Sequence, residues 1–184
     1  MTGLDSDEDT ILSIACYITD SQLNLLEPDG FETIIHHDQA ALDRMGAWCT
    51  TTHAASGLTA AALASTTTPA QAARDLLAYI QMHVRRPRSA LLAGNTVHAD
   101  KAFLRREPYA PVIQYLHHRI LDVSAIKEAA RRWSGDEVLE GSPRKQGLHD
   151  ARADILESLE EARYYRRVIF GCADNALEYT APQR

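Results

Sequence analysis

Hydrophobic and polar positions alternate near the start of the chain, and short apolar runs follow later in the sequence. Residues 11–19 and 31–36 alternate and are rich in β-branched side chains, which predicts two strands joined through a turn at residues 27–30. Residues 90–95 form an apolar run typical of a strand buried on both faces. Residues 119–123 predict one more strand.

Apolar positions at helical spacing predict helices between and after these strands. One start is well defined: Thr68 is the expected N-cap, Pro69 the first helical residue and Gln71 the partner in a capping box, with the helix running to about Val84. The other predicted helices cover residues 40–49, 59–65, 100–106, 110–117, 124–133 and 150–170, and residues 134–148 are predicted to be a polar loop. Two strands followed by strands that alternate with helices predict a single α/β domain.

Composition narrows the classes of function. The chain has 184 residues and a formal net charge of −6, which argues against a wide nucleic-acid footprint, since that needs a basic face. A small pocket charged by bound cations remains compatible with a short nucleic acid. The three cysteines, Cys16, Cys49 and Cys172, lack CxxC spacing and favour a reducing compartment inside the cell. No apolar run reaches membrane-spanning length, so no membrane partner is expected.

Two stretches carry candidate chemistry. In the first, a predicted strand ends at Gly94-Asn95-Thr96 and Asp100 follows, at the kind of strand end where α/β folds place ligands. The alternative is that Asp100 only caps its helix. In the second, His149 precedes a predicted helix that carries Asp154, a carboxylate suited to a hard cation. The alternative there is a solvated helix start, where the helix dipole favours acidic residues.

Taken together, the order and spacing of these motifs resemble the oligoribonuclease family of the DEDDh 3′-5′ exonucleases. The matching segments are Met1-Thr2-Gly3-Leu4, Trp48 with Thr52-His53 and Ser56-Gly57-Leu58, Gly94-Asn95-Thr96 with Asp100, Phe103 and Leu104, Arg119-Ile120-Leu121-Asp122-Val123-Ser124, and His149 with Asp154. The resemblance implies an RNase H-like α/β fold, with a mixed central sheet flanked by helices. It also implies an exonuclease domain over residues 1–170 and a C-terminal tail over residues 171–184.

The resemblance implies hydrolysis of very short single-stranded RNA to mononucleotides, with two Mg²⁺ or Mn²⁺ ions held by carboxylates. By this analogy Asp100 and Asp154 are metal ligands, and His149 is the base that deprotonates the attacking water. The residues assigned to the substrate are Leu4, Trp48 and His53 for the nucleotide, and Arg119 and Ser124 for the terminal phosphate across a homodimer. The cytoplasm or the mitochondrion is the expected location.

Two departures from the family pattern matter. In the family, a strand that ends Asp-any-Glu runs directly into Met-Thr-Gly-Leu, and here the sequence begins at Met1. We therefore expect the first motif and its strand to be lacking and the activity of the chain as written to be impaired. His118 stands where the family commonly has a tyrosine. Two alternatives stay open: a catalytically dead protein of the same fold that binds RNA or dimerises, and a DNA exonuclease of the same superfamily.

Overall fold

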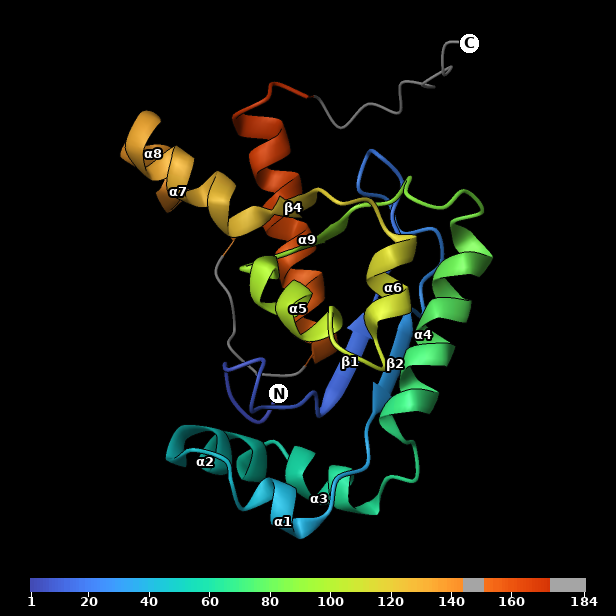
Figure 1. Ribbon diagram of the computed structural model, residues 1–184. Helices are drawn as coiled ribbons and strands as arrows, with labels where there is room; N and C mark the ends of the chain where they lie inside the picture. Colours follow the sequence, from blue (N-terminus) through green and yellow to red (C-terminus); the bar gives the residue numbers. More distant parts are fainter. Residues whose placement is uncertain (144–150, 173–184) are drawn as a thin grey trace.

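The strands of the molecule form two short ladders. The computed structural model describes residues 1–143 and 151–172 (Figure 1). Strand β1 (Ser13–Cys16) pairs antiparallel with β2 (Phe31–Ile34). Strand β3 (Leu92–Gly94) pairs parallel with β4 (Ile120–Asp122). The predicted α/β class, with parallel and antiparallel strands flanked by helices, is confirmed, and the ladders are two two-stranded sheets within the described residues.

Helices cover both ladders. They are α1 (Gln39–Leu42), α2 (Ala47–Ala55), α3 (Leu58–Ala64), α4 (Pro69–His83), α5 (Val97–Leu104), α6 (Ala110–Tyr115), α7 (Val123–Trp133), α8 (Asp136–Glu140) and α9 (Ala151–Val168). Helices α3 and α4 pack on β2, while α9 contacts both β1 and β3 and so connects the two ladders. Helices α1 to α3 form a layer at one end of the molecule, below the strands in Figure 1.

The start of α4 follows the prediction, with one difference. Thr68 is the N-cap, its hydroxyl accepts a hydrogen bond from the backbone N–H of Gln71 at 3.2 Å, and Pro69 begins the helix. The return half of the capping box is not made. The Gln71 side-chain oxygen, which would accept from the Thr68 backbone N–H, accepts instead from the Arg74 guanidinium at 2.5 Å, and the Gln71 amide donates to Asp75 at 2.6 Å.

Three details of the sequence-based prediction are wrong. The helix expected over residues 40–49 is two helices, because the chain is extended at Gly46, the N-cap of α2. The loop expected over residues 134–148 contains α8, which begins after Gly135. The strand expected to be buried on both faces is exposed on one face at Ala93, whereas Leu92, which points to the other face, packs against buried side chains.

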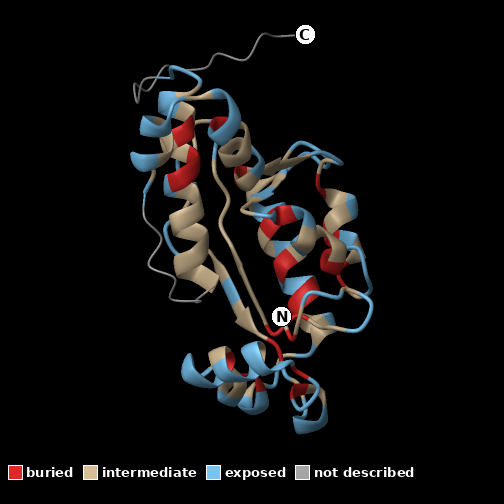
Figure 2. Ribbon diagram, turned by 90° about the vertical axis from the view of Figure 1, so that its left-hand side faces the viewer, coloured by how far each residue is buried: buried red, intermediate tan, exposed pale blue. Residues whose placement is uncertain are grey.

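Four groups of buried side chains hold these layers together. Figure 2 shows in red where the buried residues lie along the ribbon. One joins Ile11 and Ile35, at the β1–β2 ladder, to Phe103 on α5. A second packs Leu76 and Ile80 of α4 against the α6 region, and a third joins α7 to α9. Burial of these side chains therefore fixes α5 and α9 relative to the strands, which positions the residues of the candidate site.

Candidate nuclease site

The turn that connects β3 to α5 is tied to the end of β4. Thr96 adopts the left-handed conformation, with φ 54°, and its backbone N–H donates to the Asp122 carboxylate at 2.9 Å and to the Ser124 hydroxyl at 3.1 Å. Because β3 and β4 are parallel, their carboxyl ends lie at the same edge of the ladder. The structure thus brings the predicted Ser124 against the Gly94-Asn95-Thr96 segment, and the two hydroxyls of Thr96 and Ser124 lie 3.2 Å apart.

Asp122 organises this edge. Its carboxylate accepts from the backbone N–H of Ser124 at 3.0 Å and so caps α7. The second carboxylate oxygen lies 3.4 Å from Nδ1 of His98, on the first turn of α5. One carboxylate therefore fixes the starts of two helices, α5 and α7, with respect to each other.

Behind the turn lies a buried carboxylate, Glu161, on α9. Its side chain is 1% exposed and accepts from the Asn95 amide at 2.9 Å and from the Lys127 ammonium at 3.1 Å. The Tyr165 hydroxyl, one turn further along α9, donates to it at 3.4 Å. A buried carboxylate is costly without such partners, so the contacts hold α7, α9 and the β3–α5 turn in one arrangement.

We expect Glu161→Ala to lower the free energy of unfolding by about 2–3 kcal/mol, because it leaves the Asn95 amide and the Lys127 ammonium without their acceptor. The neighbouring Glu160 is a matched control, since its exposed side chain pairs with Arg163 one turn away and, within residues 1–143 and 151–172, with no other cation. Glu160→Ala should cost less than about 0.5 kcal/mol. Urea unfolding of the three proteins measures both values, and equal losses would contradict the assigned role of Glu161.

Asp100 lies inside the first turn of α5, and the N-cap of that helix is Thr96. The reading of Asp100 as a simple cap is therefore wrong. Although the side chain is open to solvent, the surrounding protein removes part of its hydration and raises its pKa, and the negative charge of Asp122 acts in the same direction. The Met1 ammonium and His98 oppose that rise. The pKa of Asp100 therefore depends on the positive charges near it.

The N-terminal segment contacts one of the predicted nucleotide-binding residues, His53, which lies beside a second one, Trp48. The Met1 carbonyl oxygen lies 2.9 Å from Nε2 of His53 on α2, and the His53 ring meets the Trp48 ring edge-on, with centroids 6.5 Å apart. His53 is buried, whereas the Trp48 and Leu4 side chains are 63% and 85% exposed. Met1 therefore contacts His53, and its terminal amine is near enough to Asp100 for the two charges to interact.

The structure says less about the remaining predicted residues, Asp154, His149 and Arg119. Asp154 lies in the first turn of α9, as expected, and His149 falls outside the described residues. Arg119 is exposed just before β4, with its backbone N–H donating to the His117 ring at 3.1 Å. Residues 1–143 and 151–172 contain no group of three or more His, Cys, Asp or Glu side chains arranged to hold a metal ion. The roles of these residues stay predictions.

Sequence reasoning missed two residues that shape the site, Asp122 and Glu161. Asp122 was part of a matching motif, and its position directly before a predicted helix was the available signal for a cap. Glu161 was hidden among the many charged residues of α9, and only the fold shows that it is buried.

Comparisons with known proteins show which family the chain belongs to. The exonuclease family RNase T matches residues 1–162. Curated relatives named oligoribonuclease are 45% identical in Mycobacterium avium, over 92% of this chain and 78% of the relative, and 46% identical in Streptomyces avermitilis, over 92% and 83%. A mitochondrial oligoribonuclease of Bos taurus is 45% identical, over 92% of this chain and 70% of the relative. The chain belongs to the oligoribonuclease family.

As a member of this family, the chain belongs to the DEDDh superfamily and is a hydrolase of the exonuclease class. Within the part of the chain that the structure describes, none of the helices has the length and apolar character needed to span a membrane. The relatives include bacterial and mitochondrial proteins.

Proposed function

We propose that the chain is a 3′-5′ exoribonuclease that hydrolyses very short single-stranded oligoribonucleotides to mononucleotides with two bound divalent cations. The observation that carries the proposal is the contact of the Met1 carbonyl with His53, beside the exposed Trp48, at the end of the chain on whose amine the Asp100 charge acts. Asp100 lies close enough to Met1 for its charge to act on the terminal amine, and the Met1 carbonyl contacts His53, which packs against the exposed Trp48. A carboxylate beside a stacking surface suits a nucleotide whose phosphate faces metal ions.

The donor chemistry around Asp100 fits divalent cations. Its pKa is raised by partial loss of hydration and by the neighbouring Asp122, so its ionised form gains from any added positive charge. The exonuclease superfamily uses divalent metal ions, and oxygen donors are those that Mg²⁺ and Mn²⁺ prefer. Asp100 and Asp154 are the residues that would hold them. Bound ions would supply charge stabilisation at the phosphate and lower the pKa of a bound water.

His149 would then take the proton from the attacking water. An imidazole suits this role because its pKa lies near neutral pH, so it is ready to accept a proton at the start of each turnover. It precedes α9, which carries Asp154, and both residues match one family motif. We assign His149 the role of base and no role in holding metal.

Substrate contacts divide between bases and phosphate. Leu4, Trp48 and His53 would hold the bases by stacking and packing, which tolerates any sequence because every base has a π face. Arg119 and Ser124 would hold the terminal phosphate across a homodimer, where a guanidinium can make two parallel hydrogen bonds. Sedimentation at twice the chain mass supports the shared site, and a fully active monomer contradicts it.

We expect Trp48→Ala to weaken binding of every dinucleotide by about 1–3 kcal/mol, whatever the bases, because it removes one stacking surface. Trp133 on α7 is a matched control, since its side chain is 82% exposed and lies on another helix. Fluorescence titration with four dinucleotides of different sequence measures the change. A loss confined to one sequence, or an equal loss in Trp133→Ala, would contradict the stacking role.

We further infer that a polypeptide of these 184 residues alone is impaired, because the family's Asp-any-Glu carboxylates are not among them. The location we propose is intracellular, either cytoplasmic or mitochondrial, which follows the bacterial and mitochondrial relatives.

A further inference from the structure

The loop that carries Leu4 is closed on itself by a single carboxylate. One oxygen of the half-buried Asp9 accepts from the Thr2 hydroxyl at 2.9 Å, and the other accepts from the backbone N–H of Asp5 at 2.9 Å. These two donors lie on either side of Gly3 and Leu4 in the sequence. The carboxylate therefore bridges the residues that flank Leu4, whose own side chain is 85% exposed.

Backbone contacts hold the same two flanks. The Asp9 N–H donates to the Asp5 carbonyl oxygen at 2.7 Å. The Thr2 N–H donates to the Thr10 carbonyl oxygen at 2.9 Å, and the Thr10 N–H donates to the Thr2 hydroxyl at 3.0 Å. Leu4 is thus an exposed apolar side chain on a loop whose ends are tied together, which leaves its backbone little freedom to move.

Gly3 packs directly on the Asp9 carboxylate. A Cβ atom at Gly3 would lie 2.2 Å from Oδ2 of Asp9, far inside contact distance. The φ of Gly3 is not in the left-handed region, so glycine is needed here for space and not for its conformational freedom. Because the carboxylate already makes two hydrogen bonds, it cannot move aside without breaking them.

Arg106 fixes this loop to the end of α5. Its guanidinium donates to the carbonyl oxygen of Ser6 and lies 3.4 Å from the Asp7 carboxylate. Since Arg106 follows α5 directly, the loop and the helix that carries Asp100 are joined by a short, covalently continuous segment.

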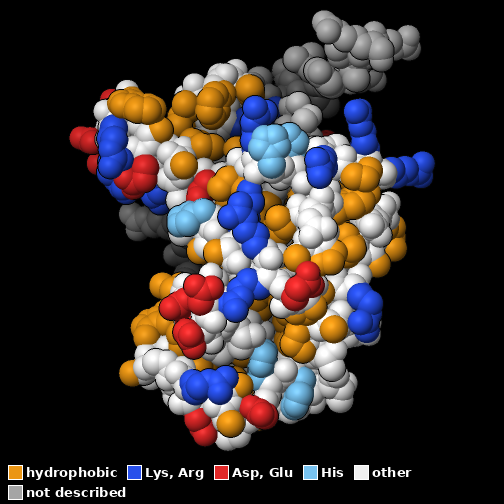
Figure 3. All heavy atoms as spheres, viewed as in Figure 1, with side chains coloured by type: hydrophobic (Ala, Val, Ile, Leu, Met, Phe, Trp, Pro, Cys, Tyr) orange, Lys and Arg blue, Asp and Glu red, His pale blue; other side chains and the backbone are white. Residues whose placement is uncertain are grey.

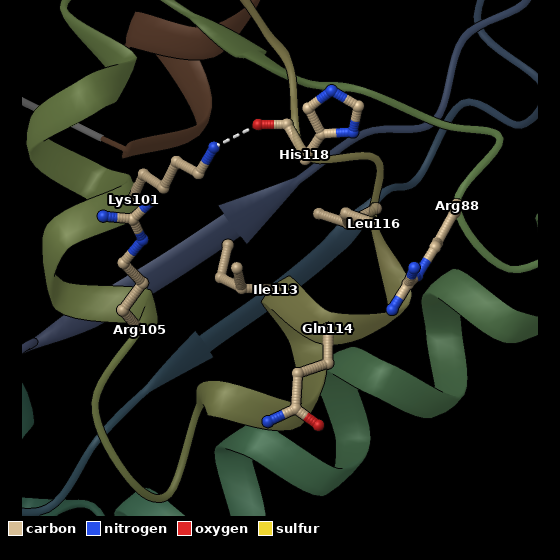
Figure 4. A pocket seen from close by; sticks show the side chains of 7 residues that line it. All are labelled: Arg88, Lys101, Arg105, Ile113, Gln114, Leu116 and His118. Atoms are coloured by element: carbon tan, nitrogen blue, oxygen red, sulfur yellow. Dashed lines mark hydrogen bonds between the residues drawn. The ribbon is translucent and has the colours of Figure 1, made fainter.

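Helix α5 is held in turn by the core and by the start of β4. Met1 packs against the buried cluster that includes Phe103. On another side of the helix, the Lys101 ammonium donates to the carbonyl oxygen of His118 at 2.6 Å (Figure 4). The tip of the loop and Asp100 are therefore connected through parts of the molecule that are themselves fixed.

The charge of the loop does not suit a direct contact with RNA. Acidic side chains gather over it in Figure 3, and Asp5, Asp7 and Glu8 are exposed. These carboxylates repel a phosphate backbone. The part of the loop that can attract a nucleotide is its apolar tip, Leu4, which packs against the flat face of a base without regard to charge.

We propose that Asp9 is a positioning residue of the exonuclease: its carboxylate holds Leu4 where that side chain packs against the bases of the substrate. This inference rests on the proposed function, in which Leu4 contacts the bases. A side chain that is held before binding loses little conformational freedom on contact, so it contributes more to affinity than the same side chain on a loose loop. Bases held at a set place also keep the phosphate in register with Asp100.

The test is a fluorescence titration of the full chain with a dinucleotide, in EDTA so that no cleavage occurs. Leu4→Ala should weaken binding by roughly fivefold or more, and Asp9→Asn by roughly threefold or more. The double variant L4A/D9N should bind within about twofold of Leu4→Ala, because Asp9 acts through the side chain that is already removed. A role of Asp9 in the fold alone would weaken binding of the Leu4→Ala chain further.

Two controls separate the position of the carboxylate from its charge. Glu8→Gln removes the same charge from the same loop, and in the described part of the chain the Glu8 carboxylate has no hydrogen-bond partner. It should change binding by less than about twofold. Gly3→Ala keeps every charge but displaces the Asp9 carboxylate, so it should reproduce the loss seen in Asp9→Asn. Gly135→Ala, where a Cβ meets nothing within 4 Å, should leave binding unchanged.

All titrations are made below the unfolding transition of each variant, as checked by circular dichroism. If Asp9→Asn unfolds the chain, the same cycle with Gly3→Ala in its place decides. A loss in Leu4→Ala without one in Asp9→Asn, or equal losses from Asp9→Asn in the parent and in the Leu4→Ala chain, would overturn the inference and leave the proposed hydrolysis standing. Unchanged binding in Leu4→Ala would instead remove Leu4 from the proposed substrate contacts, and the role of Asp9 with it.

Discussion

A polypeptide of these 184 residues should cleave a dinucleotide at least about a thousandfold more slowly than the same chain extended upstream by a strand that ends Asp-any-Glu, a difference of about 4 kcal/mol in the barrier. Two divalent ions bring four positive charges, and two carboxylates do not hold them close together against their repulsion. In the unextended polypeptide the Met1 ammonium also acts on Asp100, where it competes with a cation. A peptide bond at Met1 removes that charge.

The matched control for this comparison is the same extension ending Asn-any-Gln. It restores the strand and the neutral Met1 amide without adding carboxylates, so it separates folding from metal binding. We expect it to raise the thermal unfolding temperature as the Asp-any-Glu extension does, and to leave cleavage low. Robust turnover by the unextended polypeptide, or by the Asn-any-Gln protein, would show that the two added carboxylates are not required.

In the extended protein, His149→Ala should lower kcat by about 10²–10⁴-fold and leave Mn²⁺ affinity nearly unchanged, because the side chain moves a proton and does not hold the metal. Asp100→Asn and Asp154→Asn should weaken Mn²⁺ binding as well as turnover, since each removes a charged ligand. His36→Ala is the control histidine, exposed after β2 and outside every proposed contact with the substrate.

Mn²⁺ affinity from calorimetry and kcat from dinucleotide cleavage separate these roles. Loss of metal binding in His149→Ala would make the histidine a ligand, and full Mn²⁺ affinity in both aspartate variants would remove Asp100 and Asp154 from the metal site. A rate unchanged by His149→Ala would require another base.

Local signals in the sequence predicted local structure well. Thr68 and Pro69 defined the start of α4, because a cap and a fixed φ act within a few residues. The alternation around residues 13–16 and 31–34 found β1 and β2. The break at Gly46 and the short helix α8 were missed, since neither depends on a strong periodic pattern.

In the candidate site, too, features that depend on local sequence were predictable and contacts between distant segments were not. The resemblance singled out Ser124 and the Gly94-Asn95-Thr96 segment as separate motifs, and the structure joins them by hydrogen bonds. The support from Glu161 was not predictable, because it depends on α9 meeting a turn 66 residues away in the chain. Nor could the exposure of Ala93 be read from an apolar run, which shows that residues are apolar and not which neighbours cover them.

The most direct test of the proposed function uses a five-residue RNA carrying a label at its 5′ end or at its 3′ end, incubated with the extended protein and Mn²⁺. A 3′-5′ exoribonuclease should release the 3′ label at once as a mononucleotide and shorten the 5′-labelled strand step by step, with both reactions abolished by EDTA. Immediate release of the 5′ label, faster cleavage of the matching DNA, or tight RNA binding without cleavage would contradict the account.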